Sequence, residues 1–160
     1  MTTTYPGRTP LPCDPTERDW RWRLDTFHAT TDEEGASATL SLVDRDGTRR
    51  RGRGTGPTAL HALIAGLYEA TGYKTSLQSA KIFSARNGDT PRAQAQIVLQ
   101  NEAHEDAAGF GWAACEHDAF MVAVLRIINK WEAAISIDAY CKQTMPHHFR
   151  HIDQMSAAAA

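Results

Sequence analysis

Polar and hydrophobic residues alternate along three successive stretches in the first part of the chain, which is typical of β-strands with one buried face. The stretches are residues 19–31, 36–45 and 48–54; the hydrophobic positions of the first two are Trp20, Trp22 and Leu24, then Ala36, Ala38, Leu40 and Leu42. Turn residues follow the first stretch at 32–35 and the second at Asp46 and Gly47. The pattern therefore predicts three antiparallel strands, of which the arginine-rich last one forms a solvent-exposed edge.

The hydrophobic period changes after residue 54, and then the whole pattern repeats. Helical spacing relates Leu60, Leu63, Ile64, Leu67 and Thr71, and Gly72 is a typical helix stop. Strand-like alternation returns at 74–86, 92–100 and 105–112, before a second helical stripe of Phe120, Val124, Ile127, Ile128 and Trp131. The glycine pairs Gly54/Gly56 and Gly109/Gly111 precede the two helices at an offset of 55 residues. We predict an α+β fold of duplicated βββα units, residues 18–72 and 75–131, with two helices packed on antiparallel sheet.

The two ends of the chain lack this regular pattern. Residues 1–17 contain four of the seven prolines and little periodicity, so we expect a flexible arm. Residues 132–160 are expected to form a helical extension, continued by Ile135, Ala139 and Tyr140 as far as Pro146, and then a frayed tail. The extension is a candidate docking segment for a partner.

Composition narrows the range of functions. The net charge of −2 predicts neither a nucleic-acid binder nor a membrane-surface protein, and no apolar run approaches the roughly 20 residues of a membrane helix. The N-terminus has no apolar signal-peptide core. Cys13, Cys115 and Cys141 are too few and too widely spaced for a disulfide or zinc framework, so we expect free thiols and a cytoplasmic location.

Each glycine pair lies where a strand passes into a helix. Glycine permits a tight turn and lets a ligand or another backbone come close. Pro57 suits the first helical position, and a helix start presents unpaired N–H groups that can hold a carboxylate. A plain strand-to-helix turn explains one such motif, but two copies at matching places favour a paired binding site.

Several of these motifs resemble the C-terminal regulatory, or dimerisation, domain of the 2-isopropylmalate synthases and citramalate synthases. The similarity rests on "GTGP" at 54–57, "LQSAKI" at 77–82, "GDTPRAQAQIVL" at 88–99 and "GFGWAACEHDAFMVAVLRIIN" at 109–129. Order and spacing match over roughly 115 residues. The resemblance implies the duplicated βββα fold, a homodimer, and a feedback amino acid bound near the dimer centre.

The resemblance also implies what the chain does not do alone. In the family this domain follows a TIM-barrel catalytic domain, and here the similarity begins close to Met1, so we expect no barrel and no synthase activity by the chain itself. The chain departs from the family at Ala59, at Ser79-Ala80 and at Cys115-Glu116, positions that border the family's effector pocket. We therefore expect leucine itself to bind weakly or not at all.

Several other side chains are candidates for catalysis, metal binding or partner binding. Cys115, Glu116 and His117, with Asp118, could supply a helix-terminal thiolate and acid–base groups, but consecutive helical residues diverge, and a capping role is the alternative. His147 and His151 have the spacing of paired metal ligands, yet only His148 is near, so we assign no metal and no cofactor. The five arginines of residues 45–53 suit either an anionic partner or a guarded edge strand. The four tryptophans are expected to be core or dimer contacts, and His28 and His61 to be exposed or pocket-lining.

The leading hypothesis is a stand-alone, non-catalytic homologue of the regulatory domain. It would bind a small amino-acid-like carboxylate or act as a trans subunit of a separate barrel synthase. Its ligand site would contain Gly54, Gly56, Pro57, Thr58, Ala80, Gly109, Gly111 and Cys115. The alternatives are a repurposed biosynthetic enzyme that uses the rewritten pocket and a purely structural dimerisation module.

Overall fold

The computed structural model describes residues 5–6, 20–87 and 90–144. Its elements are β1 (Tyr5–Pro6), β2 (Trp22–Asp32), β3 (Gly35–Asp44), β4 (Arg49–Gly56), α1 (Ala59–Thr71), β5 (Thr75–Asn87), β6 (Thr90–Asn101), β7 (Asp106–Ala113) and α2 (Glu116–Thr144). The chain divides into two compact units, residues 1–129 and 130–160. Cys13, Gly88 and the histidines of residues 147–151 lie outside the described residues, as does the side chain of Cys141, so the expectations for them remain predictions.

The predicted order, three strands and a helix followed by three strands and a helix, is confirmed. The first sheet has the order β1-β2-β3-β4 and the second β5-β6-β7, and every pairing is antiparallel. The arginine-rich β4 lies at the edge of its sheet, as the sequence predicts. The short β1, which pairs with Ala29 and His28 of β2, falls within the segment expected to be a loose arm.

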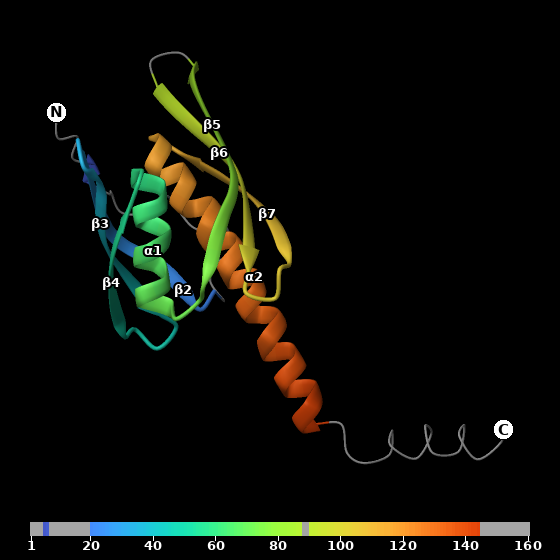
Figure 1. Ribbon diagram of the computed structural model, residues 1–160. Coiled ribbons are helices and arrows are strands. Elements are labelled where there is room, and N and C mark those ends of the chain that lie inside the picture. The colour runs from blue at the N-terminus through green and yellow to red at the C-terminus, as the bar shows by residue number, and fades with distance from the viewer. Residues whose placement is uncertain (1–4, 7–19, 88–89, 145–160) are drawn as a thin grey trace, which may run out of the picture. The chain divides into compact units, whose positions relative to one another are not determined.

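Within the first unit the two helices lie between the two sheets (Figure 1). α1 packs on β3 and β4, and the first turns of α2 pack on β7. The core is built from the inner faces of both sheets and the apolar stripes of both helices. Its largest fully buried side chains are Trp22, Leu42, Leu63, Leu67, Ile97, Leu99, Phe120, Met121, Val124, Ile127 and Ile128. Most of the alternating and helical positions of the sequence therefore lie in the core, whereas Trp20, Leu24, Leu60 and Trp131 are only half-buried.

The glycines reveal the true register of the duplication. A Cβ on Gly54 would lie 2.1 Å from the carbonyl oxygen of Ala62, and a Cβ on Gly111 would lie 1.9 Å from that of Ala119. The two glycines are 57 residues apart in the sequence, and so are the two helix residues that they contact. The strand pairing agrees, because Gly54 faces Ala38 and Gly111 faces Ala95. The offset of 55 was wrong, since Gly52 and Gly54, not Gly54 and Gly56, correspond to Gly109 and Gly111.

A β-bulge breaks the alternation of β2. The register between β2 and β3 shifts between Leu24 and Thr26, so Asp25 is an extra residue and the buried positions move from Trp22 to Phe27 and Ala29. The second sheet has the same irregularity between Leu77 and Ser79. The bulge explains why one alternation read along residues 19–31 cannot hold for the whole strand.

Asn129 is the last residue of the first unit and is buried. Its Oδ1 accepts a hydrogen bond from the Trp22 backbone N–H at 2.8 Å, and its Nδ2 donates to the Trp22 and Leu125 carbonyl oxygens, each at 2.9 Å. At the equivalent position of the first repeat, Gly72 ends α1 in a left-handed conformation. α2 continues to Thr144, the last residue that the structure describes, so the predicted helix end at Pro146 remains a prediction.

Candidate functional site

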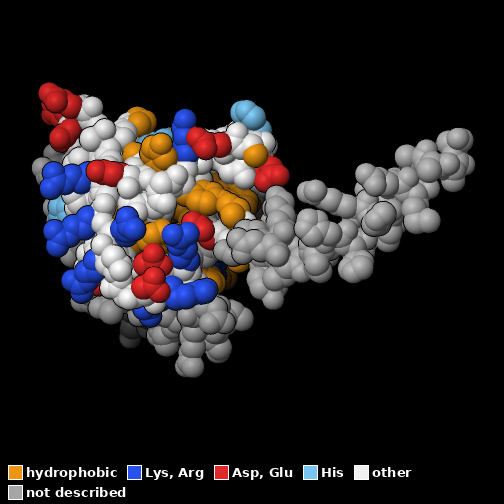
Figure 2. All heavy atoms as spheres, turned by 90° about the horizontal axis from the view of Figure 1, so that it is seen from below, with side chains coloured by type: hydrophobic (Ala, Val, Ile, Leu, Met, Phe, Trp, Pro, Cys, Tyr) orange, Lys and Arg blue, Asp and Glu red, His pale blue; other side chains and the backbone are white. Residues whose placement is uncertain are grey.

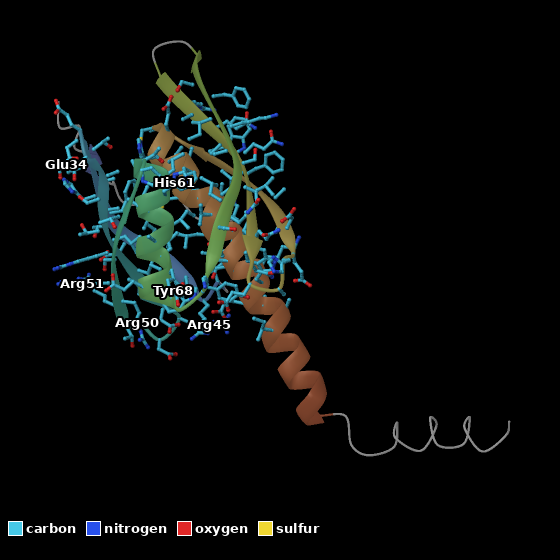
Figure 3. The ribbon with its side chains drawn as sticks, in the orientation of Figure 1. Glu34, Arg45, Arg50, Arg51, His61 and Tyr68 are labelled. Carbon is cyan, nitrogen blue, oxygen red and sulfur yellow. The ribbon has the colours of Figure 1, made fainter. Side chains whose placement is uncertain are left out.

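The first turn of α1 is capped by its own side chains. Thr58 is the N-cap, and its Oγ1 accepts a hydrogen bond from the backbone N–H of His61 and lies 2.8 Å from His61 Nδ1. The helix begins at Ala59, so Pro57 precedes the cap and does not occupy the first helical position as expected. The first turn carries no acidic residue, and His61 is exposed (Figure 3). This end of α1 therefore keeps its positive electrostatic character.

The first turn of α2 is chemically different. Cys115 occupies the position of Thr58, and its Sγ donates a hydrogen bond to Asp118 Oδ2 at 3.0 Å. Glu116 accepts a hydrogen bond from Ser84 Oγ of β5. With Glu116 and Asp118 both in the first turn, the helix dipole is already complemented by carboxylates.

The electrostatics here argue against a nucleophilic thiolate. Burial, and then the hydrogen bond to Asp118, raise the pKa of the Cys115 thiol above its ordinary value, whereas the sequence suggested a helix-stabilised thiolate. Burial also lowers the pKa of His117. Cys115 is hydrogen-bonded to Asp118 and Glu116 to Ser84, so these groups are held in separate hydrogen bonds and do not converge on one reacting atom.

The glycines assigned to a ligand site face the helices of their own repeats. The space beside Gly54 and Gly111 is occupied by helix backbone, and a Cβ on Gly56 would come within 2.7 Å of the His61 Cβ. The close approach that glycine permits at these positions is thus made by α1 and α2. Ala80 pairs with Ile97 in the second sheet and is exposed. Thr58 and Cys115, the other predicted ligand residues, lie at the helix starts, and both helices begin at the upper end of the view in Figure 1.

The outer face of the second sheet, the face turned away from the helices, carries three large aromatic residues. Phe83, Phe110 and Trp112 are 55%, 47% and 56% exposed. Phe83 and Trp112 flank Gln94 in one row across β5, β6 and β7, and Phe110 pairs with Gln96 in the next row. We call these three residues the aromatic face. Their clustering was missed by the sequence reasoning, although the alternation of Phe110 and Trp112 with buried residues in β7 was an available signal.

The corresponding outer face of the first sheet has a different chemistry. Its rows contain Thr26, Ser41 and Arg51, then His28, Thr39 and Arg53. His28 lies within β2, which continues to Asp32, and is exposed. Figure 2 shows lysine and arginine side chains gathered on the left, the side on which β3 and β4 lie in Figure 1. The duplicated units thus share a fold but present unlike outer surfaces.

The described part of the chain contains neither a cluster of metal ligands nor a membrane-spanning helix. Among residues 5–6, 20–87 and 90–144, no three His, Cys, Asp or Glu side chains are grouped so that they could hold a metal ion. Within the same residues, no helix is both long and apolar enough to span a bilayer.

The sequence matches the model of one known protein family. No curated protein matches the chain significantly. The family described as the LeuA allosteric (dimerisation) domain matches residues 14–132, which include both βββα repeats. The resemblance to the regulatory domain of 2-isopropylmalate synthase is thereby confirmed, and the chain belongs to the LeuA allosteric (dimerisation) domain family.

Proposed function

We propose that the chain is a non-catalytic regulatory module that forms a homodimer through the aromatic face. The observation that carries the proposal is the exposure of Phe83, Phe110 and Trp112 on one sheet face. Large aromatic side chains are enriched in the buried centres of interfaces. The family description, an allosteric dimerisation domain, supports a second copy as the occupant.

The exposed aromatic area is large enough to matter for association. About half of each side chain is exposed, which corresponds to roughly 100 Å² each and about 300 Å² per protomer. At about 25 cal/mol per Å², burying this area on two protomers contributes roughly 15 kcal/mol before the cost of association. That cost is roughly 4–15 kcal/mol, so we expect a dimer that forms at micromolar concentration.

The test is a single substitution on the aromatic face. Replacing Trp112 by Gln keeps a side chain like those of its neighbours Gln94 and Gln96 and removes the largest exposed aromatic group. We expect the dimer dissociation constant to rise about 100-fold or more, because roughly 200 Å² of apolar contact is lost from the dimer. Analytical ultracentrifugation measures the constant.

The matched control is Tyr68→Gln, a change at a comparably exposed aromatic residue of α1 (Figure 3). It should leave the dimer intact. A dimer unaffected by Trp112→Gln, or weakened equally by both changes, would contradict the assigned interface. If the wild-type chain stays monomeric but binds a barrel synthase through Trp112, the homodimer is excluded and the chain acts as a trans subunit of that synthase.

We further propose that the regulatory ligand is a small amino-acid-like carboxylate held at the start of α1. The first turn of α1 has no acidic residue, while that of α2 already has Glu116 and Asp118, so an anion is favoured at α1. Thr58 and the exposed His61 supply polar groups there. The glycines contribute by bringing β4 and α1 together, because their open sides contact the helix and not solvent.

A further inference from the structure

The outer face of the first sheet concentrates positive charge. Residues that pair across antiparallel strands point to the same face of the sheet. Arg49, Arg51 and Arg53 of β4 therefore all lie on the outer face, and Arg23 of β2 lies in the same row as Arg49. Arg50 belongs to the opposite face, in the row of the buried Leu42. Figure 3 shows the Arg51 side chain pointing away from α1, as expected for the outer face.

The local charge is opposite to that of the whole chain, whose net charge is −2. Among the described residues, four arginines and His28 lie on this face, and Asp25 of the bulge is the carboxylate that lines the same part of it. That carboxylate accepts a hydrogen bond from Ser41 Oγ at 3.4 Å and lies 3.6 Å from Arg49 Nε. The acidic hairpin tip that contains Glu34 lies at the other end of the sheet (Figure 3).

The same face is hollowed. A shallow basin of about 480 Å³ lies over β2, β3 and β4, with Asp25 and His28 on one side and Arg49, Arg51 and Arg53 on the other. The hydroxyl-bearing Ser41 and Thr39 line it from the central strand β3. Its size falls within the range of small-molecule sites, about 300–1,000 Å³.

We propose that this arginine basin binds a small anion that carries two or more carboxylate or phosphate groups. Arg51 and Arg53 are two residues apart on one strand, so their Cα atoms are separated by about 6.7 Å, a spacing that suits two anionic groups of one molecule. Both side chains are exposed, and among the described residues neither guanidinium has an ion-pair partner. Guanidinium groups bind carboxylate and phosphate through paired hydrogen bonds, and the hydroxyl group of Thr39 adds a donor.

Protection of the edge strand does not account for this arrangement. Charges on an edge strand discourage pairing with another chain. The edge of β4 is also covered at Arg53, whose backbone N–H donates to the Glu69 carboxylate of α1. Edge protection does not require three arginines on the face that also carries the hollow and the hydroxyl groups.

The test uses pyrophosphate and citrate as probes and acetate as the monovalent reference, each measured by titration calorimetry at a constant ionic strength of about 0.1 M. We expect at least one multivalent probe to bind with a dissociation constant below about 1 mM, and acetate to bind at least tenfold more weakly. Binding of pyrophosphate alone identifies phosphate as the preferred group, and binding of citrate alone identifies carboxylate. Either result supports the basin.

Three arginine variants distinguish binding in the basin from non-specific attraction of anions to positive charge. Arg51→Gln and Arg53→Gln change exposed side chains, and each should weaken binding about tenfold, while Arg50→Gln on the opposite face should change it less than twofold. A wild-type chain that binds neither probe more tightly than acetate would overturn the proposal. An equal loss of affinity in Arg50→Gln would also overturn the proposal. Trp112 lies on the other sheet, so these outcomes are independent of dimerisation.

Discussion

Gly111→Ala tests the contact between strand and helix that sets the register of the second repeat. The added Cβ would lie 1.9 Å from the carbonyl oxygen of Ala119 and 2.7 Å from the backbone nitrogen of Ala123. Both atoms belong to helix backbone and cannot rotate away as a side chain would. To reach an ordinary contact of about 3.4 Å, α2 must retreat from β7 by about 1.5 Å.

A retreat of that size affects the whole buried stripe of α2. Phe120, Val124 and Ile127 are almost completely buried, and a gap of 0.5–1 Å already removes about a quarter to a half of a contact's dispersion energy. We therefore expect the free energy of unfolding to fall by about 3 kcal/mol or more, at or above the upper end of the usual cost of overpacking. That is a large part of the roughly 5–15 kcal/mol that stabilises a typical domain.

The measurement is urea unfolding followed by far-ultraviolet circular dichroism, at several protein concentrations so that dimerisation is accounted for. Gly54→Ala should cost about as much, because its Cβ would lie 2.1 Å from the carbonyl oxygen of Ala62. Gly72→Ala is the control. No atom lies within 4 Å of its added Cβ, and only its left-handed φ of 74° opposes the change, at about 1–2 kcal/mol. A cost for Gly111→Ala no greater than that for Gly72→Ala would refute the assigned contact.

Two further predictions concern the helix starts. Ala59→Glu should supply the missing first-turn carboxylate of α1, so an acid that stabilises the wild-type chain in a thermal-shift screen of amino acids and 2-oxo or 2-hydroxy acids should no longer stabilise this variant, whose melting temperature without ligand should be unchanged or higher. Tyr68→Glu, at the other end of α1, should still be stabilised by the same acid. Binding that survives Ala59→Glu would place the ligand elsewhere. Burial lowers the folded-state pKa of His117 below its unfolded value near 6.5, so its contribution to stability is present above that pH and is lost as the pH falls through the folded pKa. His117→Gln should therefore weaken the decline in unfolding free energy between pH 7 and pH 5, and an unchanged decline would assign the effect to other groups.

The sequence predicted the fold because its two hydrophobic periods are local signals. Alternating Ala36, Ala38 and Leu40 mark β3, and the helical spacing of Leu63 and Leu67 marks α1, since each period reports which face of an element is buried. The end of α1 at Gly72 was also predictable, because glycine readily adopts the left-handed conformation found there.

The tertiary structure decided the features that depend on contacts between distant residues. The offset of 57, and not 55, follows from which helix carbonyl oxygen meets Gly54 or Gly111, and no local pattern contains that information. Cys115 illustrates the same limit, because its burial and its bond to Asp118, which raise its pKa, exist only in the folded chain.

The sequence by itself determined the order of the strands β2 to β7 and of the two helices, the buried faces of β3, β6 and both helices, and the family. Only the folded chain showed that the repeats present different outer faces, with Phe83 and Trp112 aligned on one sheet and Arg51 and Arg53 beside hydroxyl groups on the other. The physical reason is that periodicity reports burial within one element, whereas a surface is assembled from neighbouring strands. Strand register, together with the bulge at Asp25, decides which side chains lie next to one another.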